Sequence, residues 1–458
     1  MRVIICGAGQ VGLGIAERLA AEGNDVIVID SSAKLVQRAN DMLDVRATLG
    51  NGAHPDVLAR AGARDADMLI AVTFHDEVNM VACHVASTIF NVPTKIARVR
   101  AQTYLGKEWS QLFRSQGLNI DYIISPEIEV GNVVLRRLEL PGAFETASFV
   151  NGQVLAIGVN CGAECPIVDT PLNQLRELFP DLPATVVAIV RNGELFLPAK
   201  EQRLAQGDDV YLILPSKMVS RTLKIFGHEE VQARRIVIAG GGNIGEFVAR
   251  EIDQREPNIS VKIIEYRHDR ALAIAESLKR TVILNGSALS EELLREADIR
   301  NAETLVALTN DDQVNILTSV LARNLGCRSS LCLLNSAAYS SIMRPFGIDA
   351  QINPRAVTVS RILQYVRRGR IRGVHEICNS AGEIVEAEAL TTTPVVGKAI
   401  KDLGISEGVR FGIIVRDGEI VMPNGNTELR PRDRAILFVR SDFVREVEQL
   451  FRVRPDYF

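Results

Sequence analysis

The sequence predicts an α/β protein built as a tandem duplication, with two doubly wound parallel sheets that are each followed by a small α+β domain. Three observations support this fold class. A glycine-rich turn follows an apolar strand twice, at Gly7–Gly12 and at Gly240–Gly245. Short apolar runs then alternate with helical patterns, which is typical of a parallel sheet with right-handed crossovers. Each half ends in short strands separated by turn pairs such as Asn192-Gly193 and Asp417-Gly418.

The repeat extends beyond the glycine turns. The matched segments are Asn51-Gly52 with Asn285-Gly286, Leu69–Thr73 with Leu305–Thr309, and Val190–Glu194 with Val415–Glu419. Self-similarity along the whole chain indicates one duplication with about 230 residues in each half.

The elements follow one another in the same order in both halves. In the α/β part of the first half, strands are predicted at 3–6, 26–29, 69–73 and 95–97. In the second half they are predicted at 236–239, 281–284, 304–308 and 331–334. Pro126 and Pro354 begin two further helices, near residues 127–138 and 355–368. Proline is tolerated there because its missing N–H would have no helical partner.

These elements give a domain organisation of two α/β domains, two connecting helices and two small domains. The predicted segments are an N-terminal domain at 1–124, a crossover helix and linker at 125–141, a small domain at 142–227, a second α/β domain at 233–352, a second crossover helix and linker at 353–371, and a second small domain at 372–455.

Composition narrows the class of function. The net charge is −4 and the chain has one Trp, so neither the basic excess nor the aromatic surface typical of nucleic-acid binding is expected. No apolar run approaches the roughly 18–20 residues that span a bilayer, and Met1-Arg2 leads directly into a strand, so we expect a cytoplasmic protein. The seven Cys are expected to be reduced thiols, and a zinc site at Cys161 and Cys165 is not expected.

The first glycine turn has the context of a Rossmann dinucleotide site. Gly7 permits the tight turn, Gly9 lets the backbone approach a pyrophosphate, and Gly12 lets the helix pack on the sheet. The backbone of Ala8, Gln10 and Val11 belongs to the same turn, and the helix N-terminus favours an anion. Asp30 ends the second strand, where a carboxylate binds ribose hydroxyls and repels a 2′-phosphate, so NAD(H) is favoured over NADP(H).

The second half repeats this site with differences. The turn comprises Ala239, Gly240, Gly241, Gly242, Asn243 and Ile244. Glu265 takes the place of Asp30, and Arg267 two residues later makes rejection of NADP less certain. The alternative to nucleotide binding is that each glycine turn serves packing only and binds no ligand. This alternative has more weight for the second turn than for the first.

Further candidate contacts lie at strand ends. Asn51-Gly52 and Asn285-Gly286 are adenine contacts or ordinary turns, and Thr73 and Thr309 contact the ligand or cap the next helix. Arg98 and Arg100 either bind nucleotide phosphates or form a solvated face. Leu333 and Asn335 stand at the equivalent positions, so the two sites are expected to differ.

Catalytic groups are hard to find. None of the six His repeats between the halves or sits in a recognisable acid/base pair. The small domains are too short and too β-rich to serve as substrate domains. We therefore expect a ligand sensor with no enzymatic activity and no metal site. The alternatives are a soluble NAD-dependent oxidoreductase, supported by the glycine motif alone, and a scaffold with vestigial sites.

The ordered set of motifs resembles a known family. Gly7–Gly12, Asp30, Asn51-Gly52, Val72–Asn79 and Ile96–Arg100 resemble the RCK (also called KTN) domain, which regulates potassium channels and transporters. The small domain is similar to the C-terminal RCK module. Two such pairs in one chain resemble the peripheral regulatory subunits of bacterial Trk potassium uptake systems, and the resemblance covers essentially the whole chain.

The resemblance implies a cytoplasmic homotetramer at the inner face of the cell membrane, bound to an integral-membrane potassium-translocating subunit. Its RCK units would form a gating ring, and NAD(H) would compete with ATP or ADP to alter potassium flux. The implied nucleotide contacts in the first half are Gly7, Gln10, Val11, Asp30, Asn51, Thr73 and Arg98. Those in the second half are Gly240, Asn243, Ile244, Glu265, Asn285 and Thr309, and the missing Arg pair departs from the first copy.

Overall fold

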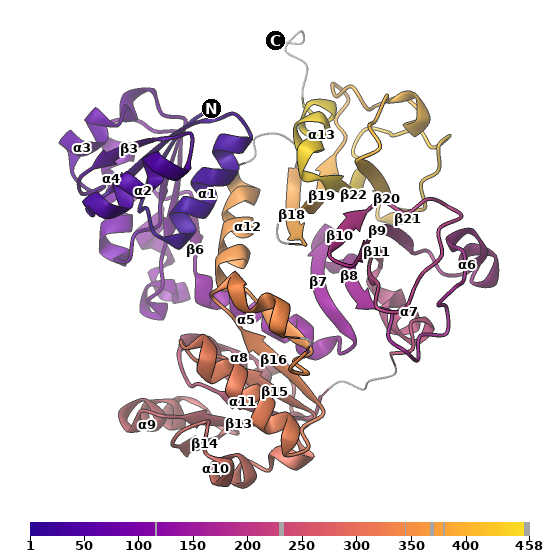
Figure 1. Cartoon of the computed structure of the whole chain (residues 1–458). Helices are drawn as coiled ribbons and strands as arrows, with labels where there is room; N and C mark the ends of the chain where they lie inside the picture. Colours follow the sequence, from indigo (N-terminus) through magenta and orange to yellow (C-terminus); the bar gives the residue numbers. More distant parts are fainter. Residues whose placement is uncertain (115–116, 229–232, 344, 367–370, 379–380, 453–458) are drawn as a thin grey trace. The chain divides into compact units, whose positions relative to one another are not determined.

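The computed structural model describes residues 1–114, 117–228, 233–343, 345–366, 371–378 and 381–452 (Figure 1). The chain divides into two compact units. The first comprises Met1–Val130 with Asn353–Val366, and the second comprises Gly131–Ile352 with Arg367–Phe458. The first unit therefore contains a segment that the sequence repeat assigns to the second half.

The first unit is built on a six-stranded parallel sheet with the order β3-β2-β1-β4-β5-β6. The strands are β1 Arg2–Cys6, β2 Asp25–Asp30, β3 Arg46–Leu49, β4 Met68–Ala71, β5 Thr94–Arg98 and β6 Tyr122–Ile124. The order reverses between β1 and β4, and in open α/β sheets ligands bind outside the carboxyl ends of the strands at such a point. The doubly wound sheet expected from the glycine turn is confirmed.

Helices cover both faces of this sheet. They are α1 Gln10–Ala21, α2 Ala33–Met42, α3 Pro55–Arg60 and α4 Asp76–Thr88. Alternate residues of β1 point to opposite faces, as the period of two in a strand requires. Ile4 and Cys6 enter the core shared with α3 and α4, whereas Val3 and Ile5 enter the core shared with α1.

The helix α12, Pro354–Val366, completes the core on the α1 side. Its buried residues Val359, Ile362 and Leu363 belong to the same cluster as Val3 and Ile5. The sequence repeat places this crossover helix with the second half, but the structure packs it on the first α/β domain. Helix α5, Pro126–Glu139, is divided between the two units. Its residues up to Val130 belong to the first unit, and those from Gly131 onward belong to the second.

The second parallel sheet repeats the first, with the order β14-β13-β12-β15-β16-β17. Its strands are β12 Arg235–Ala239, β13 Ser260–Glu265, β14 Val282–Asn285, β15 Thr304–Ala307, β16 Ser329–Leu333 and β17 Ala350–Ile352. Its helices are α8 Asn243–Arg255, α9 His268–Ser277, α10 Glu291–Glu296 and α11 Asp312–Asn324. A Cβ on Gly131 would lie 2.3 Å from the Phe247 ring, so α5 packs closely on α8.

Two antiparallel sheets form the small domains, with the orders β10-β9-β11-β8-β7 and β18-β19-β22-β20-β21. The strands are β7 Ala143–Phe149, β8 Val154–Asn160, β9 Thr185–Arg191, β10 Glu194–Phe196, β11 Asp209–Pro215, β18 Ile371–Ile377, β19 Gly382–Glu388, β20 Val409–Arg416, β21 Glu419–Val421 and β22 Arg434–Arg440. The helices are α6 Leu172–Leu178, α7 Val219–Ile225 and α13 Val444–Leu450. The two sheets share one core, in which Phe149 and Ile213 join Ile413 and Phe438.

Each small domain carries the same buried ion pair. Arg191 donates two hydrogen bonds of 2.7 Å to Asp208, and Arg416 donates to Asp433 at 2.9 and 2.7 Å. Both carboxylates are almost completely buried, so each depends on its arginine to offset the cost of desolvation. The matched pairs confirm the duplication seen in the sequence.

Several expected boundaries, at 227/233, 371/372 and 455, fall on or beside residues 229–232, 367–370 and 453–458, which lie outside the described residues. Within the described ranges, no helix is both long enough and apolar enough to cross a bilayer. In the same ranges, no three His, Cys, Asp or Glu side chains gather in a way that could hold a metal ion.

Candidate functional site

Two of the three glycines in the first turn are explained by the fold. Gly7 has a φ of +113°, a conformation that favours glycine, and its N–H donates to the Ile29 carbonyl at 2.7 Å. A Cβ on Gly12 would lie 1.8 Å from the carbonyl oxygen of Gly7, so only glycine lets α1 pack there.

Gly9 is different, because nothing in the fold requires it to be glycine. It is the N-cap of α1 with an ordinary φ of −70°, and a Cβ built on it would meet nothing within 4 Å. Gly9 and Gln10 are exposed, and Val11 is half-buried. The open space faces the N-terminus of α1, where unpaired N–H groups favour an anion.

Asp30 lies at the end of β2 beside this turn. Its carboxylate accepts hydrogen bonds from the backbone N–H of Ala8 at 2.7 Å and of Ser32 at 2.8 Å. These bonds hold the carboxylate against the glycine turn, where the sequence placed a ribose-binding group. The remaining acceptor positions of its two oxygens are available to hydroxyl donors.

Thr73 is held in place by a side chain that the motif analysis did not single out as a site residue. The buried Asn79 Oδ1 accepts from the Thr73 N–H at 2.8 Å and from its hydroxyl at 2.7 Å. The Asn79 amide donates to the Arg98 carbonyl at 2.9 Å and thereby ties the end of β5 to the loop after β4. The Thr73 hydroxyl is thus a donor inside the protein and could only accept from a ligand. The repeated Asn79 and Asn315 were the sequence signal for this arrangement.

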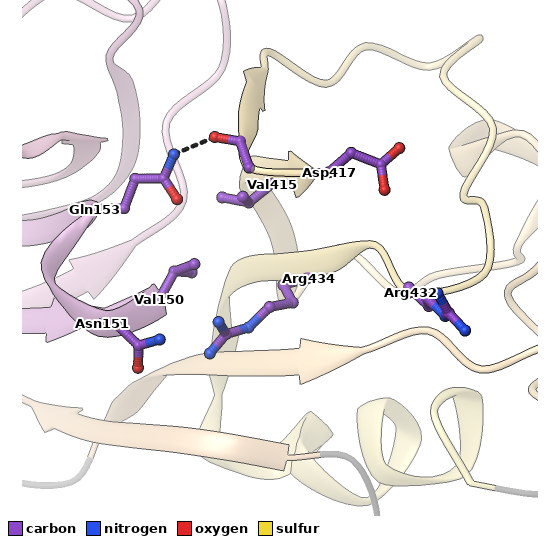
Figure 2. Close-up of a pocket in the computed structure, with 8 residues that line it drawn as sticks. Val150, Asn151, Gln153, Val415, Asp417, Arg432 and Arg434 are labelled. Carbon is purple, nitrogen blue, oxygen red and sulfur yellow. Dashed lines mark hydrogen bonds between the residues drawn. The ribbon is translucent and has the colours of Figure 1, made fainter.

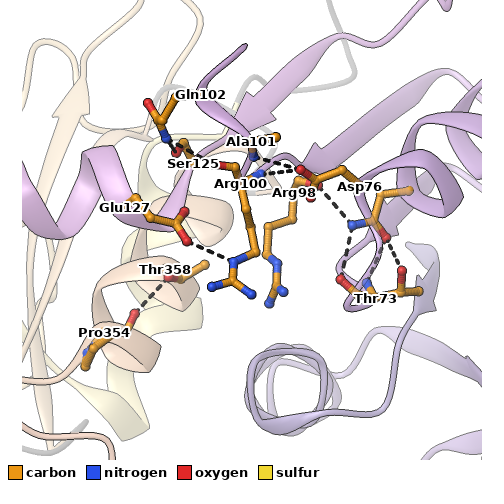
Figure 3. Close-up of polar contacts among 11 residues, drawn as sticks. Thr73, Asp76, Arg98, Arg100, Ala101, Gln102, Ser125, Glu127, Pro354 and Thr358 are labelled. Carbon is orange, nitrogen blue, oxygen red and sulfur yellow. Dashed lines mark hydrogen bonds and ion pairs between the residues drawn. The ribbon is translucent and has the colours of Figure 1, made fainter. Parts of the chain in front are cut away.

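Arg98 and Arg100 bring positive charge to the same edge, and Figure 3 shows their guanidinium groups side by side. Arg100 Nε donates to the buried Glu127 Oε1 at 2.8 Å, and its guanidinium lies 5.6 Å from the centroid of the exposed Phe74 ring. Within the described part of the chain, the buried Nε of Arg98 has no hydrogen-bond partner. Burial, and after it the charge of Arg100, lowers the pKa of Arg98.

The arginine pair is not simply a solvated face, because Arg100 is ion-paired with Glu127 and Arg98 is half-buried. Among the described residues Arg98 has no ion-paired carboxylate of its own, although the charges of Glu127 and Asp76 act on it, and an anion beside it would supply such a partner. Phosphate binding by the pair stays a prediction.

Asn51 and Gly52 have structural explanations. Asn51 Oδ1 accepts from the Ala53 N–H at 2.9 Å, which is an Asx turn. A Cβ on Gly52 would lie 2.7 Å from the Cys6 sulfur, so glycine is needed for packing. The Nδ2 group of Asn51 remains able to donate to a ligand.

The expected match between Asn51-Gly52 and Asn285-Gly286 is wrong by two residues. Asp30 pairs with Leu49 in the first sheet, and Glu265 pairs with Asn285 in the second. Gly50 and Gly286, at φ +155° and +156°, are therefore the equivalent glycines. The two Asn-Gly pairs were matched because their residues are identical, but Asn-Gly is a common turn sequence. The strand register shows which positions of the two halves are equivalent.

Asn285 consequently has a different setting from Asn51. Its amide donates to the carbonyls of Glu265 and Tyr266 at 2.9 and 3.2 Å, and its Oδ1 lies 3.0 Å from His268 Nδ1. Thr309 repeats the arrangement of Thr73, because Asn315 Oδ1 accepts from its N–H and hydroxyl at 2.9 and 2.7 Å.

The second glycine turn has the same backbone as the first. Gly240 has a φ of +105°, and a Cβ on Gly242 would meet nothing within 4 Å, as at Gly9. Gly242 and Asn243 are exposed, Ile244 is half-buried, and Ala239 is fully buried at the end of β12. Glu265 accepts from the Gly241 N–H at 2.8 Å and from the Arg267 N–H at 2.9 Å. Both glycine turns therefore leave the same open space beside the N-terminus of the following helix.

The charges around the second turn are paired internally. Arg270 Nε donates to the Gly241 carbonyl at 2.9 Å, and its Nη2 donates to Glu246, in the first turn of α8, at 2.5 Å. Leu333 ends β16 where Arg98 ends β5, and Asn335 takes the place of Arg100. The expected difference between the two sites is therefore present in the structure, because only the first has an arginine pair at this edge.

A separate cavity of about 470 Å³ lies between the two small domains (Figure 2). Its lining residues are Val150, Asn151, Gln153, Val415, Asp417, Gly418, Arg432 and Arg434. Arg434 is ion-paired with Glu386, and Gln153 donates to the Gly418 carbonyl across the cavity. None of these residues belongs to the nucleotide site expected from the sequence.

Comparison with known proteins places the chain in a family. The TrkA-N domain family matches residues 3–126 and 236–354, and the TrkA-C domain family matches residues 158–227 and 384–452. The Trk system potassium uptake protein TrkA of Azorhizobium caulinodans is 54% identical over the full length of both chains. The chain belongs to the TrkA family of Trk potassium uptake proteins. The family members of Halomonas elongata and Vibrio alginolyticus are 40% and 37% identical over at least 99% of each chain.

Solved structures agree with this fold. The GsuK RCK domain crystal structure aligns with a TM-score of 0.61 and 16% identity over 98% of this chain and 94% of that chain. A structure described as the GsuK channel bound to NAD aligns with a TM-score of 0.61 and 17% identity over 98% of this chain and 78% of that one. At this identity the likeness concerns the fold alone, and it agrees with the tandem arrangement of TrkA-N and TrkA-C domains in this chain.

Proposed function

We propose that the first α/β domain binds NAD(H) and, in competition with it, ATP or ADP, and that ligand exchange there regulates potassium uptake. One observation carries this proposal. Gly9 has neither a backbone conformation nor a packing contact that requires glycine, yet it borders the open space at the N-terminus of α1. A pyrophosphate at that position needs a backbone without a side chain.

The groups around Gly9 fit the parts of such a ligand. The N–H groups at the start of α1 would bind the pyrophosphate or the first phosphates of a nucleotide. The Asp30 carboxylate would accept from the ribose hydroxyls, and its charge disfavours a 2′-phosphate. Arg98 and Arg100 would bind the third phosphate of ATP, which extends beyond the position of the pyrophosphate.

The second site is proposed to bind a nucleotide with fewer charges. Gly242 leaves the same open approach, and Glu265 occupies the position of Asp30. Arg250 and Arg270 pair with Glu246, and Leu333 replaces Arg98, so a triphosphate lacks the arginine pair of the first site. NAD(H) is the ligand that suits both sites, and ATP suits the first.

Regulation requires an assembly and a partner. The curated relatives are named as proteins of the Trk potassium uptake system. We propose that this chain acts without catalysis as the peripheral subunit of an integral-membrane potassium translocator at the cytoplasmic face, and that it assembles as a homotetrameric ring. The two ligands must stabilise different ring conformations, because equal affinity for both conformations shifts nothing.

Calorimetric titration with NADH, NAD, ATP, ADP and NADPH tests the proposal. Gly9→Val should abolish ligand binding at the first site and leave the second intact, and Gly242→Val should do the reverse. Both variants should stay folded because a Cβ at either position would meet nothing within 4 Å. ATP should displace NADH from the first site, and Gly9→Val should remove the nucleotide dependence of potassium uptake by vesicles that contain the membrane partner. Unchanged affinities in Gly9→Val would show that the site is misplaced.

A further inference from the structure

A short exposed segment, Tyr266–Asp269, lies beside the second glycine turn. It follows Glu265, the last residue of β13, whose carboxylate accepts from the Gly241 N–H. Tyr266 is 77% exposed and the Arg267 side chain is 73% exposed, so packing within the chain accounts for neither. The segment borders the place where a dinucleotide site of this kind holds the ribose of the adenosine.

Side-chain hydrogen bonds hold the backbone of this segment in place. The Asn285 amide donates to the carbonyls of Glu265 and Tyr266 at 2.9 and 3.2 Å, and its Oδ1 lies 3.0 Å from His268 Nδ1. Glu265 Oε1 in turn accepts from the Arg267 N–H at 2.9 Å. The segment is therefore exposed but restrained, and Arg267 is presented to solvent from a fixed position.

The first copy lacks this arrangement. The corresponding residues are Ser31–Lys34, in which the charge stands at the last position and Ser32 takes the place of Arg267. The strand register places Leu49 at the position of Asn285. The Leu49 side chain is apolar and 52% exposed, so it cannot form the hydrogen bonds of an asparagine. The restraints from Asn285 and the guanidinium of Arg267 thus have no counterpart in the first copy.

Arg267 changes the electrostatics beside Glu265. Its Nε lies 3.9 Å from Glu265 Oε1, and Glu265 is almost completely buried whereas Arg267 is exposed. The guanidinium therefore lies on the solvent side of the carboxylate, offsets its charge, and can donate to a ligand through its Nη groups. Arg270, by contrast, is engaged with the Gly241 carbonyl and with Glu246. A 2′-phosphate that a lone carboxylate would repel thus meets a guanidinium at this site.

We propose that the second site binds dinucleotides with a 2′-phosphate on the adenosine ribose, namely NADP(H), at least as tightly as NAD(H). This inference rests on the nucleotide binding proposed above for the second glycine turn. Arg267 donates to the 2′-phosphate, and Glu265 accepts from the 3′-hydroxyl of the same ribose. Tyr266 offers its exposed ring to the adenine. The two copies therefore differ in specificity, because the first has a carboxylate without an adjoining arginine and rejects the 2′-phosphate.

Calorimetric titration of full-length Gly9→Val with NADPH and with NADH tests the proposal, because a side chain at Gly9 should close the first site. We expect NADPH to bind this variant at least as tightly as NADH, and we expect Gly242→Val to lose NADPH binding. If Gly9→Val bound NADH more tightly than NADPH, the assignment of the 2′-phosphate would be overturned while nucleotide binding at the second turn stood. If Gly9→Val bound neither dinucleotide, the proposed second site would fail as well.

The first copy supplies a matched variant, Arg267→Ser, which copies Ser32. In the Gly9→Val background it should weaken NADPH binding by about tenfold or more and leave NADH binding nearly unchanged, because only the 2′-phosphate loses its partner. An equal loss for both dinucleotides, or no loss for NADPH, would refute the role of Arg267. The thermal unfolding midpoint should not change, since the Arg267 side chain is exposed.

Two smaller probes identify the position of the phosphate. Adenosine 2′,5′-bisphosphate should displace NADPH from Gly9→Val, and adenosine 3′,5′-bisphosphate should not, because Glu265 faces the 3′ position in the proposed arrangement. Displacement by the 3′,5′ isomer alone would indicate a 3′-phosphorylated nucleotide as the ligand and would overturn the proposal. Equal displacement by both isomers would show a general attraction to phosphate charge and would overturn it too.

Discussion

Arg98 offers a test in which stability and ligand binding should move in opposite directions. Its Nε is buried without a hydrogen-bond partner among the described residues, and burial lowers the pKa of its guanidinium. An unsatisfied buried donor costs about 1–3 kcal/mol. The substitution Arg98→Leu copies Leu333, which is 4% exposed at the same position of the second sheet, so the backbone accepts it. We expect the unfolding free energy of the first unit to rise by roughly 1 kcal/mol.

A change of this size should raise the midpoint of thermal unfolding by about 2–4 °C for a unit of this length. ATP affinity should change the other way. A hydrogen bond to a charged group contributes about 1.5–3 kcal/mol, and each 1.4 kcal/mol is tenfold, so ATP should bind about 10- to 100-fold more weakly. NADH should be affected less, because in the proposed site the start of α1 would hold its pyrophosphate.

Differential scanning fluorimetry and calorimetric titration measure the two effects. Arg100→Leu is the matched control, because it breaks the ion pair with the buried Glu127 and should lower the unfolding midpoint. If Arg98→Leu lowered the midpoint and left ATP affinity unchanged, Arg98 would be a structural residue and the assignment of a phosphate site would fail.

Three further outcomes are expected. Gly12→Ala should destabilise the first unit and lower its unfolding midpoint, because the new Cβ would lie 1.8 Å from the Gly7 carbonyl oxygen; an unchanged midpoint would contradict that geometry. Asp30→Asn should narrow the preference for NADH over NADPH in competitive titration, since it removes the charge that repels a 2′-phosphate, and an unaltered preference would argue against a ribose-binding role. Burial opposes ionisation of Glu145, but the hydrogen bond from His375 prevails and the pKa of Glu145 is lowered. Its stabilising contribution is thus present above about pH 4.3 and lost as the pH falls through the folded pKa, so the midpoint difference between wild type and Glu145→Gln should shrink below about pH 4.

The sequence predicted the two parallel sheets and the order of their elements because apolar periodicity and glycine turns are local signals. Gly7 and Gly12 could be assigned from the motif, and the structure supplies the φ and the close contact that require them. Register was harder to predict. The match of Asn51 to Asn285 is wrong because it followed residue identity, whereas the pairing of Glu265 with Asn285 is a property of the folded sheet.

Contacts between distant segments could not be predicted at all. The packing of α12 on α1 depends on Val359 and Ile362 filling a core more than three hundred residues away in the sequence from Ile15, and the periodicity of each helix is satisfied by any apolar partner. The role of Asn79 was hidden for a related reason. The repeat of Asn79 as Asn315 marks the position, but nothing in the sequence shows that its amide bonds the Arg98 carbonyl on the neighbouring strand.

Helix α5 could link ligand binding in the first unit to the second unit, because its residues are divided between the two. Glu127 lies in the first turn of α5 and pairs with Arg100 at the edge where the nucleotide site is proposed, while the residues of α5 from Gly131 onward belong to the other unit. A phosphate that takes Arg100 competes with Glu127 for the same guanidinium, whereas a pyrophosphate held at the start of α1 leaves that ion pair in place. ATP and NAD(H) would therefore differ in their effect on α5 even when they bind the same domain. This is the differential interaction that a switch requires, because a ligand shifts a conformational equilibrium only by the difference in its affinity for the two states.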